Sequence, residues 1–290
     1  MQDQLINNVS DTALWIAAYR ALESEHTDAV FKDPLARKLA GERGFKMVEA
    51  TPIKDHMAFA MVTRTTGIDR LINLGVERGI DTVINLGAGL DTRPYRMRLP
   101  VNLRWVEVDF PSMIEYKTPL LENEKPACLL LRIAVDLSND QERKTIFARL
   151  GAETKRALII TEGVVGYLTN EQGAQLSKDI FAIPAFYYWI MDYHGGLRHH
   201  RRATDLKKIL TNAPLQFNVE DPIAFFTSHG WKVHENIYLL DEGDRIGRHL
   251  PPFKFPLNLF IKLFPKKARE IGNKTYGYVL LGKPPAPKGG

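Results

Sequence analysis

The sequence predicts an α/β fold built on a seven-stranded, mostly parallel sheet with helices on both faces. From residue 80 onward, short apolar runs alternate with helical segments at spacings of roughly 25 to 30 residues, which is the pattern of βαβ units. The stretch before residue 80 instead carries apolar residues at helical spacing. A segment rich in Pro, Phe and Lys interrupts the pattern before the last strand. We therefore expect an N-terminal helical cap, a strand-and-helix core and one late insertion.

Length and composition indicate an ordinary globular chain. It has 290 residues, of which 44% are hydrophobic and 25% charged, which argues against disordered, collagen-like and coiled-coil classes. A chain of this size supports one large domain, which we place at residues 1–283, followed by a flexible tail at 284–290. The net charge of +5 (39 basic minus 34 acidic residues) is too small to indicate a nucleic-acid partner.

Cysteine content and hydropathy predict a cytoplasmic protein. Cys128 is the only cysteine, so an intramolecular disulfide is excluded and a cysteine-based zinc site is disfavoured. The first eleven residues include two acids and no apolar core, unlike a signal peptide. The longest apolar runs, at 182–191 and 255–264, fall short of the roughly 20 residues that span a bilayer. We expect no transmembrane segment.

The first 79 residues are predicted to form the helical cap. Ser10 stands where a helix N-cap is expected, and Asp33-Pro34 is typical of the start of another helix. The first of these helices has apolar residues at helical intervals: Leu14, Ala17, Ala18 and Leu22.

Seven apolar runs are predicted as strands. They lie at residues 81–89, 103–109, 128–136, 157–162, 185–192, 231–240 and 276–281. The first six belong to a core at 80–240, which also holds a helix at 221–228 with an Asp-Pro start signal. The last run belongs to a final strand at 275–283.

The insertion is placed at residues 241–274, where we expect it to cover the site or form an interface. Its part at 251–267 mixes aromatic residues with lysines, a composition that also suits contact with a membrane surface. We favour a lid over the site.

A glycine-containing turn follows the first predicted strand. Gly87 and Gly89 lack Cβ atoms, so a ligand can approach the backbone there, although a tight turn without a ligand has the same pattern. A dinucleotide fingerprint requires a third glycine where this chain has Thr92, and no P-loop Gly-Lys-Ser/Thr is present. The turn therefore favours a nucleoside without a pyrophosphate, such as S-adenosylmethionine; a nicotinamide-dependent oxidoreductase is the alternative.

Acidic residues end the next three predicted strands. Asp109 lies about 20 residues after the turn, where an acid can accept hydrogen bonds from both ribose hydroxyls, and Glu107 is the alternative. Asp136 and the following Leu137 are candidates for the adenine, and Glu162 for the region around the sulfonium. Carboxyl ends of parallel strands meet at one edge of a sheet, so these groups should converge there, although each could merely cap a helix.

Four separated segments, in order, resemble the leucine carboxyl methyltransferase family. They are residues 9–14, continuing through 20–24 to 33–36; residues 81–96; residues 105–111; and residues 161–169. The resemblance spans about residues 9–195 and is weak beyond Gly196. It implies a Rossmann-like methyltransferase fold and an S-adenosylmethionine-dependent O-methyltransferase. The acceptor it implies is a carboxylate or hydroxyl of a small molecule or peptide.

The resemblance also implies roles for individual residues. Arg64 would hold the methionine carboxylate through its planar fork, with Arg20 as a helper from the cap, and Tyr167 would lie near the acceptor. Arg64 could instead be an exposed residue of an amphipathic helix. The remaining predicted cofactor-binding residues are Gly87, Ala88, Gly89, Asp109, Phe110, Asp136, Leu137, Glu162 and Gly163.

The catalytic step places few demands on the protein. A carboxylate acceptor needs no base, whereas a phenol or alcohol would need one, for which Tyr167, His194 or Asp192 could serve. The adjacent His199 and His200 diverge on a helix, so no metal is predicted. A non-catalytic partner protein with this fold is the other alternative. We expect a monomer or a dimer.

Overall fold

A seven-stranded sheet runs through the centre of the molecule. The computed structural model describes residues 10–195, 212–253 and 256–284. Within them the strands lie in the order β3 (Leu129–Ala134), β2 (Arg104–Asp109), β1 (Thr82–Leu86), β4 (Ala157–Thr161), β5 (Phe186–His194), β7 (Tyr276–Gly282) and β6 (Lys232–Tyr238). The first five are parallel, and β7 is antiparallel to both β5 and β6. The predicted seven-stranded, mostly parallel sheet is confirmed.

Strand burial follows position in the sheet. All residues of β1, β4 and β7 are buried, as their continuous apolar sequences require of strands covered on both faces. The edge strand β3 is more open, and its Leu129 and Leu131 side chains are exposed. The positions that end β1, β2, β4 and β5 therefore lie on a rigid, buried support.

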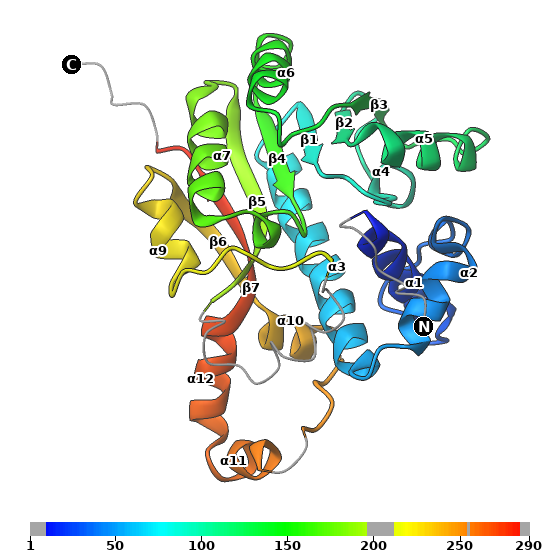
Figure 1. Ribbon diagram of the computed structural model, residues 1–290, viewed down its shortest axis with the longest axis vertical. Helices are drawn as coiled ribbons and strands as arrows, with labels where there is room; N and C mark the ends of the chain where they lie inside the picture. The colour runs from blue at the N-terminus through cyan, green and yellow to red at the C-terminus, as the bar shows by residue number, and fades with distance from the viewer. Residues whose placement is uncertain (1–9, 196–211, 254–255, 285–290) are drawn as a thin grey trace.

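Helices cover both faces of the sheet (Figure 1). On one face, α6 (Asp140–Ala152), α7 (Asn170–Ala182) and α9 (Pro222–Thr227) pack their apolar residues against the strands in one core cluster. On the other face, α3 (Lys54–Glu77) contributes Ile68, Leu71 and Ile72 to a second cluster. The short α4 (Arg93–Arg96) follows β1, and α5 (Pro111–Leu120) follows β2.

The N-terminal helices α1 (Asp11–Glu25) and α2 (Ala36–Glu49) pack together and share a third apolar cluster with α3. Ser10 precedes α1 as predicted, but its side chain makes no capping hydrogen bond. The second helix begins at Ala36, slightly later than the Asp-Pro pair, and the Asp33 carboxylate accepts from the Ala36 amide at 3.1 Å. Asp33 thus supplies the start signal from outside the helix.

The expected helix at 221–228 is present as α9, and Asp221 accepts from the Ala224 amide at its start. The segment before the last strand folds into α10 (Leu239–Arg245), α11 (Leu257–Leu263) and α12 (Pro265–Thr275). In Figure 1, α10 lies beside β7, and α11 and α12 form the bottom of the molecule. Among the described residues, no helix is both long and apolar enough to cross a membrane. His199, His200 and residues 285–290 lie outside the described part of the chain.

Candidate functional site

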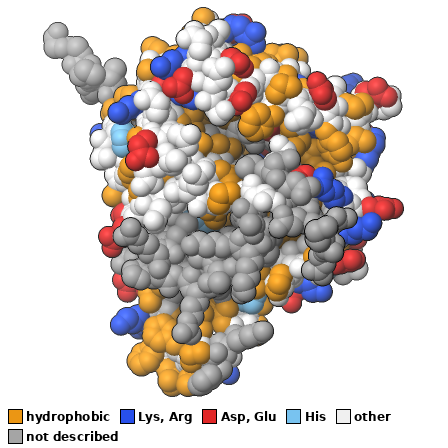
Figure 2. Space-filling view, viewed as in Figure 1, with side chains coloured by type: hydrophobic (Ala, Val, Ile, Leu, Met, Phe, Trp, Pro, Cys, Tyr) orange, Lys and Arg blue, Asp and Glu red, His pale blue; other side chains and the backbone are white. Residues whose placement is uncertain are grey.

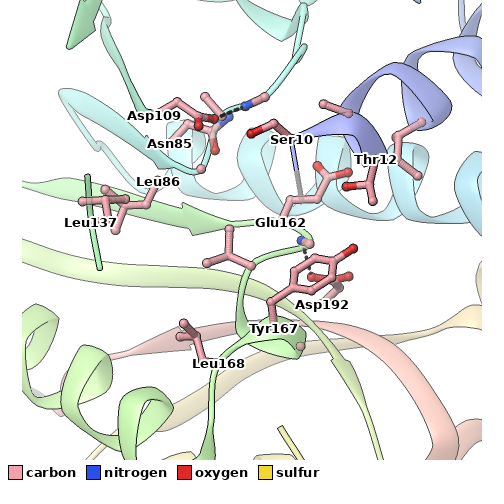
Figure 3. Close-up of a pocket in the computed structure, with 18 of the residues that line it drawn as sticks. Ser10, Thr12, Asn85, Leu86, Asp109, Leu137, Glu162, Tyr167, Leu168 and Asp192 are labelled. Atoms are coloured by element: carbon pink, nitrogen blue, oxygen red, sulfur yellow. Dashed lines mark hydrogen bonds between the residues drawn. The ribbon is translucent and has the colours of Figure 1, made fainter. Parts of the chain in front are cut away.

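A cavity of about 640 Å³ opens at the carboxyl edge of the parallel strands. Its walls come from the ends of β1, β2, β4 and β5, from the start of β7, and from the N-terminal helices α1 and α3 (Figure 3). This is the edge at which ligands bind in open α/β sheets, and the volume lies within the usual range of small-molecule sites. The sheet thus brings the predicted strand ends to one place.

The glycine turn after β1 lines this cavity, and both glycines are required by its geometry. Gly87 has φ +68° and Gly89 φ +48°, in the left-handed region that favours glycine. A Cβ on Gly87 would lie 2.5 Å from Val164 Cγ2, in the loop after β4, which is closer than atoms pack. The turn therefore presents backbone, with Ala88 between the glycines, directly to the cavity.

Asp109 and Phe110, at the end of β2, stand beside this turn. One Asp109 carboxylate oxygen accepts from the Gly89 amide at 2.6 Å and the other from the Phe110 amide at 2.7 Å. Burial raises the pKa of Asp109 above its usual value, although both amides act in the opposite direction. An ionised carboxylate has about four acceptor positions, so two remain for hydroxyl groups of a ligand.

The other strand-end acids lie differently. Glu107 is buried away from the cavity lining, with ion pairs of 2.8 Å to Lys117 and 2.9 Å to Arg132. Asp136 follows the end of β3 and accepts from the amide and hydroxyl of Ser138. Leu137, next to it, lines the cavity, whereas Asp136 does not. The carboxylate of Asp136 therefore shapes the turn that carries Leu137.

Arg64 on α3 reaches the cavity and lies between two carboxylates. Its Nε is 2.9 Å from Glu162 Oε1, and its Nη1 donates to Asp192 Oδ2 at 3.4 Å. Burial acts to lower the pKa of Arg64, but the charges of Glu162 and Asp192 outweigh burial and hold it above the usual value. Asp192 also accepts from the Gly163 amide at 2.8 Å. Arg64 is therefore a buried, charged member of the site.

This ion pair is part of a larger charged cluster. Arg93 Nη1 donates to Glu162 Oε2 at 2.7 Å and Arg93 Nε to Asp69 at 2.6 Å, and Asp69 also accepts from Arg96. The cluster contains three arginines against four carboxylates: Arg64, Arg93 and Arg96, with Asp69, Asp91, Glu162 and Asp192. The formal balance is therefore −1, which suits a ligand that brings a positive charge.

Tyr167, His194 and Tyr276 line the cavity near Asp192. Burial raises the pKa of Tyr167 and of Tyr276, so both hydroxyls stay protonated and can donate hydrogen bonds. Burial also lowers the pKa of His194 to about 4, so its imidazole is neutral near pH 7. The rings of His194 and Tyr276 lie 4.3 Å apart because their strands pair at these residues.

Arg20, the predicted helper from α1, lines the cavity and also bonds to the protein through two of its nitrogens. Its Nε donates to Asp33 at 2.8 Å and its Nη2 to the Leu90 carbonyl at 2.5 Å. Asp33 also accepts from the Thr92 hydroxyl at 2.6 Å. Arg20 and Asp33 thus fasten the glycine turn to the N-terminal helices.

Sequence reasoning missed several residues of the site. Asn85 is the next-to-last residue of β1, and its buried Oδ1 has no hydrogen-bond partner within the described residues, whereas its amide donates to Asp91. Its position two residues before Gly87 was the available signal. Tyr276 gave no such signal, because it comes from a distant part of the chain. Arg93 lies four residues after Gly89, but its part in the site depends on Asp69 and Glu162, which are distant in sequence. In the described stretches 241–253 and 256–274, expected to cover the site, no residue lines the cavity.

Among the described residues, no cluster of three or more His, Cys, Asp or Glu side chains is arranged to hold a metal ion.

The family to which the chain belongs indicates what the cavity holds. The family model described as leucine carboxyl methyltransferase matches residues 13–181, more than half of the chain. The chain belongs to the leucine carboxyl methyltransferase family. It is therefore an S-adenosylmethionine-dependent methyltransferase, and the oxidoreductase alternative is set aside.

Relatives agree with this assignment. A Streptomyces avermitilis protein, provisionally named an S-adenosyl-L-methionine-dependent methyltransferase, is 35% identical over 240 residues, which cover 76% of this chain and 82% of that protein. A provisionally named methyltransferase of the same kind from Streptomyces coelicolor is 36% identical over 171 residues, covering 55% of this chain and 60% of its own length. The names of both relatives agree with a methyltransferase that uses S-adenosylmethionine.

Solved structures share the fold. A Streptomyces avermitilis protein of the DUF574 family superposes with a TM-score of 0.57 at 13% identity, covering 92% of this chain and 97% of that chain. A provisionally named methyltransferase from Thermobifida fusca gives 0.55 at 17% identity, covering 97% and 96%. At these identities the likeness shows the architecture alone.

Proposed function

We propose that this methyltransferase transfers a methyl group to an oxygen, and that the acceptor is a carboxylate of a small molecule or peptide. The observation that supports a carboxylate is the lack of a suitable base among the three candidates. Tyr167 stays protonated, and His194, with a pKa of about 4, is a poor proton acceptor near neutrality. Asp192 is held by Arg64 and the Gly163 amide. A carboxylate is already ionised and needs no base.

The residues of the cavity fit the cofactor. The Cβ-free turn at Gly87–Gly89 leaves room for a nucleoside against the backbone, and Asp109 keeps two acceptor positions for ribose hydroxyls. The orphaned Asn85 Oδ1 can accept a hydrogen bond from a bound group. Arg64 is the cation that would hold the methionine carboxylate, and the net negative charge of its cluster suits a sulfonium.

The other predicted residues would support this arrangement. Phe110 and Leu137 offer apolar surface for the adenine, with Asp136 holding the turn of Leu137. Glu162 and Gly163 would border the transferring methyl group, and Arg20 would act on the cofactor through the turn that it fastens. The sulfonium supplies the activated methyl group when the cofactor is bound.

The protein's own part in the reaction is to position the acceptor. The protonated Tyr167 hydroxyl can donate to one oxygen of an acceptor carboxylate and leave the other in line with the methyl group. Arg64, which borders both the cofactor and the acceptor side, fixes Glu162 and Asp192 around this space. Alignment and exclusion of water, rather than proton transfer, would then set the rate.

The proposal includes the domain organisation, the compartment and the oligomeric state of the chain. Residues 1–283 would act as one domain in which the helices before residue 80 close the cavity and the insertion at 241–274 lies beside the core. The single buried Cys128 supports a reducing compartment, for which we propose the cytoplasm. Either a monomer or a dimer is compatible with a site whose described walls come from one chain.

A pH profile of turnover tests the carboxylate proposal. With methyl-labelled cofactor and a panel of carboxylate and phenol acceptors, carboxylates should be methylated at a rate that is level above about pH 6, because their pKa is about 4. Turnover of phenols alone, with a rate that rises towards alkaline pH, would contradict the proposal and point to a base.

A further inference from the structure

The lower end of the molecule exposes an unusual amount of apolar surface. Eleven large hydrophobic side chains are exposed among the described residues, and five of them lie within 15 residues of sequence: Leu257, Leu259, Leu263, Phe264 and Ile271. The other six are spread over four separate regions of the chain. Figure 2 shows hydrophobic side chains gathered at the bottom of the molecule, where Figure 1 places α11. Single exposed apolar residues are common, whereas a cluster marks a contact surface.

Helix α11 is the centre of this cluster. Its sequence is mostly apolar, although the helix is exposed. It reads Leu-Asn-Leu-Phe-Ile-Lys-Leu, apolar on almost every side, yet none of its residues is buried. A helix that is apolar all round is normally buried in a core or in lipid. Phe260 and Ile261 are half-buried and Phe260 contacts Phe264, but Leu257, Leu259 and Leu263 remain exposed in the described structure.

Positive charge surrounds this apolar surface. Lys262, Lys266 and Lys267 are exposed, and in the described structure none of them takes part in an ion pair with an acidic side chain. Between residues 256 and 269 the sequence contains no acid. Arg269, in contrast, is paired with Asp241 and Asp244, which fastens α12 to α10. The lysines are left for an external partner.

We propose that α11 and the start of α12 dock onto an anionic lipid surface. Leu263 and Phe264, exposed by 62% and 54%, would enter the boundary between head groups and acyl chains, while the lysines contact lipid phosphates. A second copy of the chain is the less suitable occupant, because a two-fold contact through this surface would bring the lysines of both copies together. The overall charge of +5 adds to the attraction.

Flotation with lipid vesicles tests this surface. The full chain should float with vesicles of equal parts phosphatidylglycerol and phosphatidylcholine, bind pure phosphatidylcholine vesicles far less, and be released by high salt. Leu263→Asp with Phe264→Asp should abolish flotation. Replacing Lys262, Lys266 and Lys267 by Gln should weaken binding roughly 100-fold, at about fivefold for each lysine.

A control variant and two control measurements show whether a change in flotation comes from this surface. Val101→Asp, at an apolar side chain that is 81% exposed elsewhere on the surface, should leave flotation unchanged, and all variants should keep the melting temperature and cofactor binding of the parent. Flotation of the Leu263→Asp/Phe264→Asp variant at the parental level would overturn the proposal. Equal binding to both vesicle types would also overturn it. So would a parent protein that is dimeric, if the double variant were monomeric and bound lipid as the parent does.

Discussion

The two halves of the cavity are built on different principles. The half around Gly87, Gly89 and Asp109 consists of backbone and one carboxylate, and its shape depends on missing Cβ atoms. The half around Arg64 and Glu162 is a buried cluster of opposite charges, in which almost every polar group has a partner. Substitutions in the first half should therefore act through steric overlap, and substitutions in the second half through unbalanced charge.

The largest effect is expected from the charged half. Arg64→Met would leave the buried Asp192 without a cation and Glu162 with Arg93 alone, and removing one partner of a buried pair costs about 3 to 5 kcal/mol. The free energy of unfolding, measured in urea, should fall by that amount, and affinity for S-adenosylhomocysteine should fall as well.

A compensated variant separates these two losses. Arg64→Met with Asp192→Asn removes one charge of each sign and leaves Glu162 paired with Arg93, so stability should recover in large part while cofactor affinity stays low. Recovery of affinity together with stability would show that Arg64 acts only in folding and does not contact the ligand.

The glycine half is tested by Gly87→Ala. The added Cβ meets Val164 at 2.5 Å in a backbone with φ +68°, so we expect a loss of about 3 kcal/mol in stability and roughly 100-fold in cofactor affinity. Gly247→Ala is the matched control, since its φ is +67° and an added Cβ has nothing within 4 Å. It should cost only about 1 kcal/mol. Equal costs at both sites would refute the steric account of the turn.

In the half around the glycine turn, Asp109→Ala should weaken cofactor binding by about 30-fold, because about 2 kcal/mol of hydrogen bonding to a charged group is lost. It should also lower stability by about 1 to 3 kcal/mol, since the Gly89 and Phe110 amides lose their acceptor. Asp136→Ala is the paired variant. Its carboxylate bonds Ser138 and lies outside the cavity lining, so titration calorimetry should show only about a threefold loss. A reversed order would assign the ligand contact to Asp136.

The smallest expected effect is a pH dependence of stability that comes from His194, which lines the cavity near the charged half. The pKa of His194 is about 4 in the folded chain and about 6.5 when unfolded, so the unfolded state takes up a proton first as pH falls. The contribution of His194 to the free energy of unfolding is present above pH 6.5 and is lost as the pH falls below that value. The loss is about 1 kcal/mol between pH 7 and pH 5.5. His194→Gln should remove this part of the slope in urea unfolding. An unchanged slope would mean that His194 is not buried as a neutral imidazole.

The contrast between the halves also explains what the sequence could predict. Gly87, Gly89 and Asp109 lie within about 25 residues on consecutive strands, so the rules for βα turns place them without tertiary information. His194 and Tyr276 meet only because β7 inserts antiparallel beside β5, a register that no local pattern encodes. The order of the sheet was therefore harder to predict than the existence of its strands.

Charge pairing was equally hidden from the sequence. Arg20 is predicted to help bind the cofactor, and nothing in its local sequence indicates that it also bonds Asp33 and the Leu90 carbonyl. The insertion was expected as a lid because aromatic and basic residues suit a cover. Nothing in its composition distinguished a cover from the exposed helix that α11 forms.

The most direct test of this account is isothermal titration of the purified chain with S-adenosylhomocysteine, with NADH as the control ligand and Asp109→Ala as the control protein. The account predicts one site per chain with micromolar affinity, a clear loss of affinity in Asp109→Ala, and no heat from NADH. Undiminished binding to Asp109→Ala, or binding of NADH in place of S-adenosylhomocysteine, would contradict the proposal that this cavity holds the methyl donor.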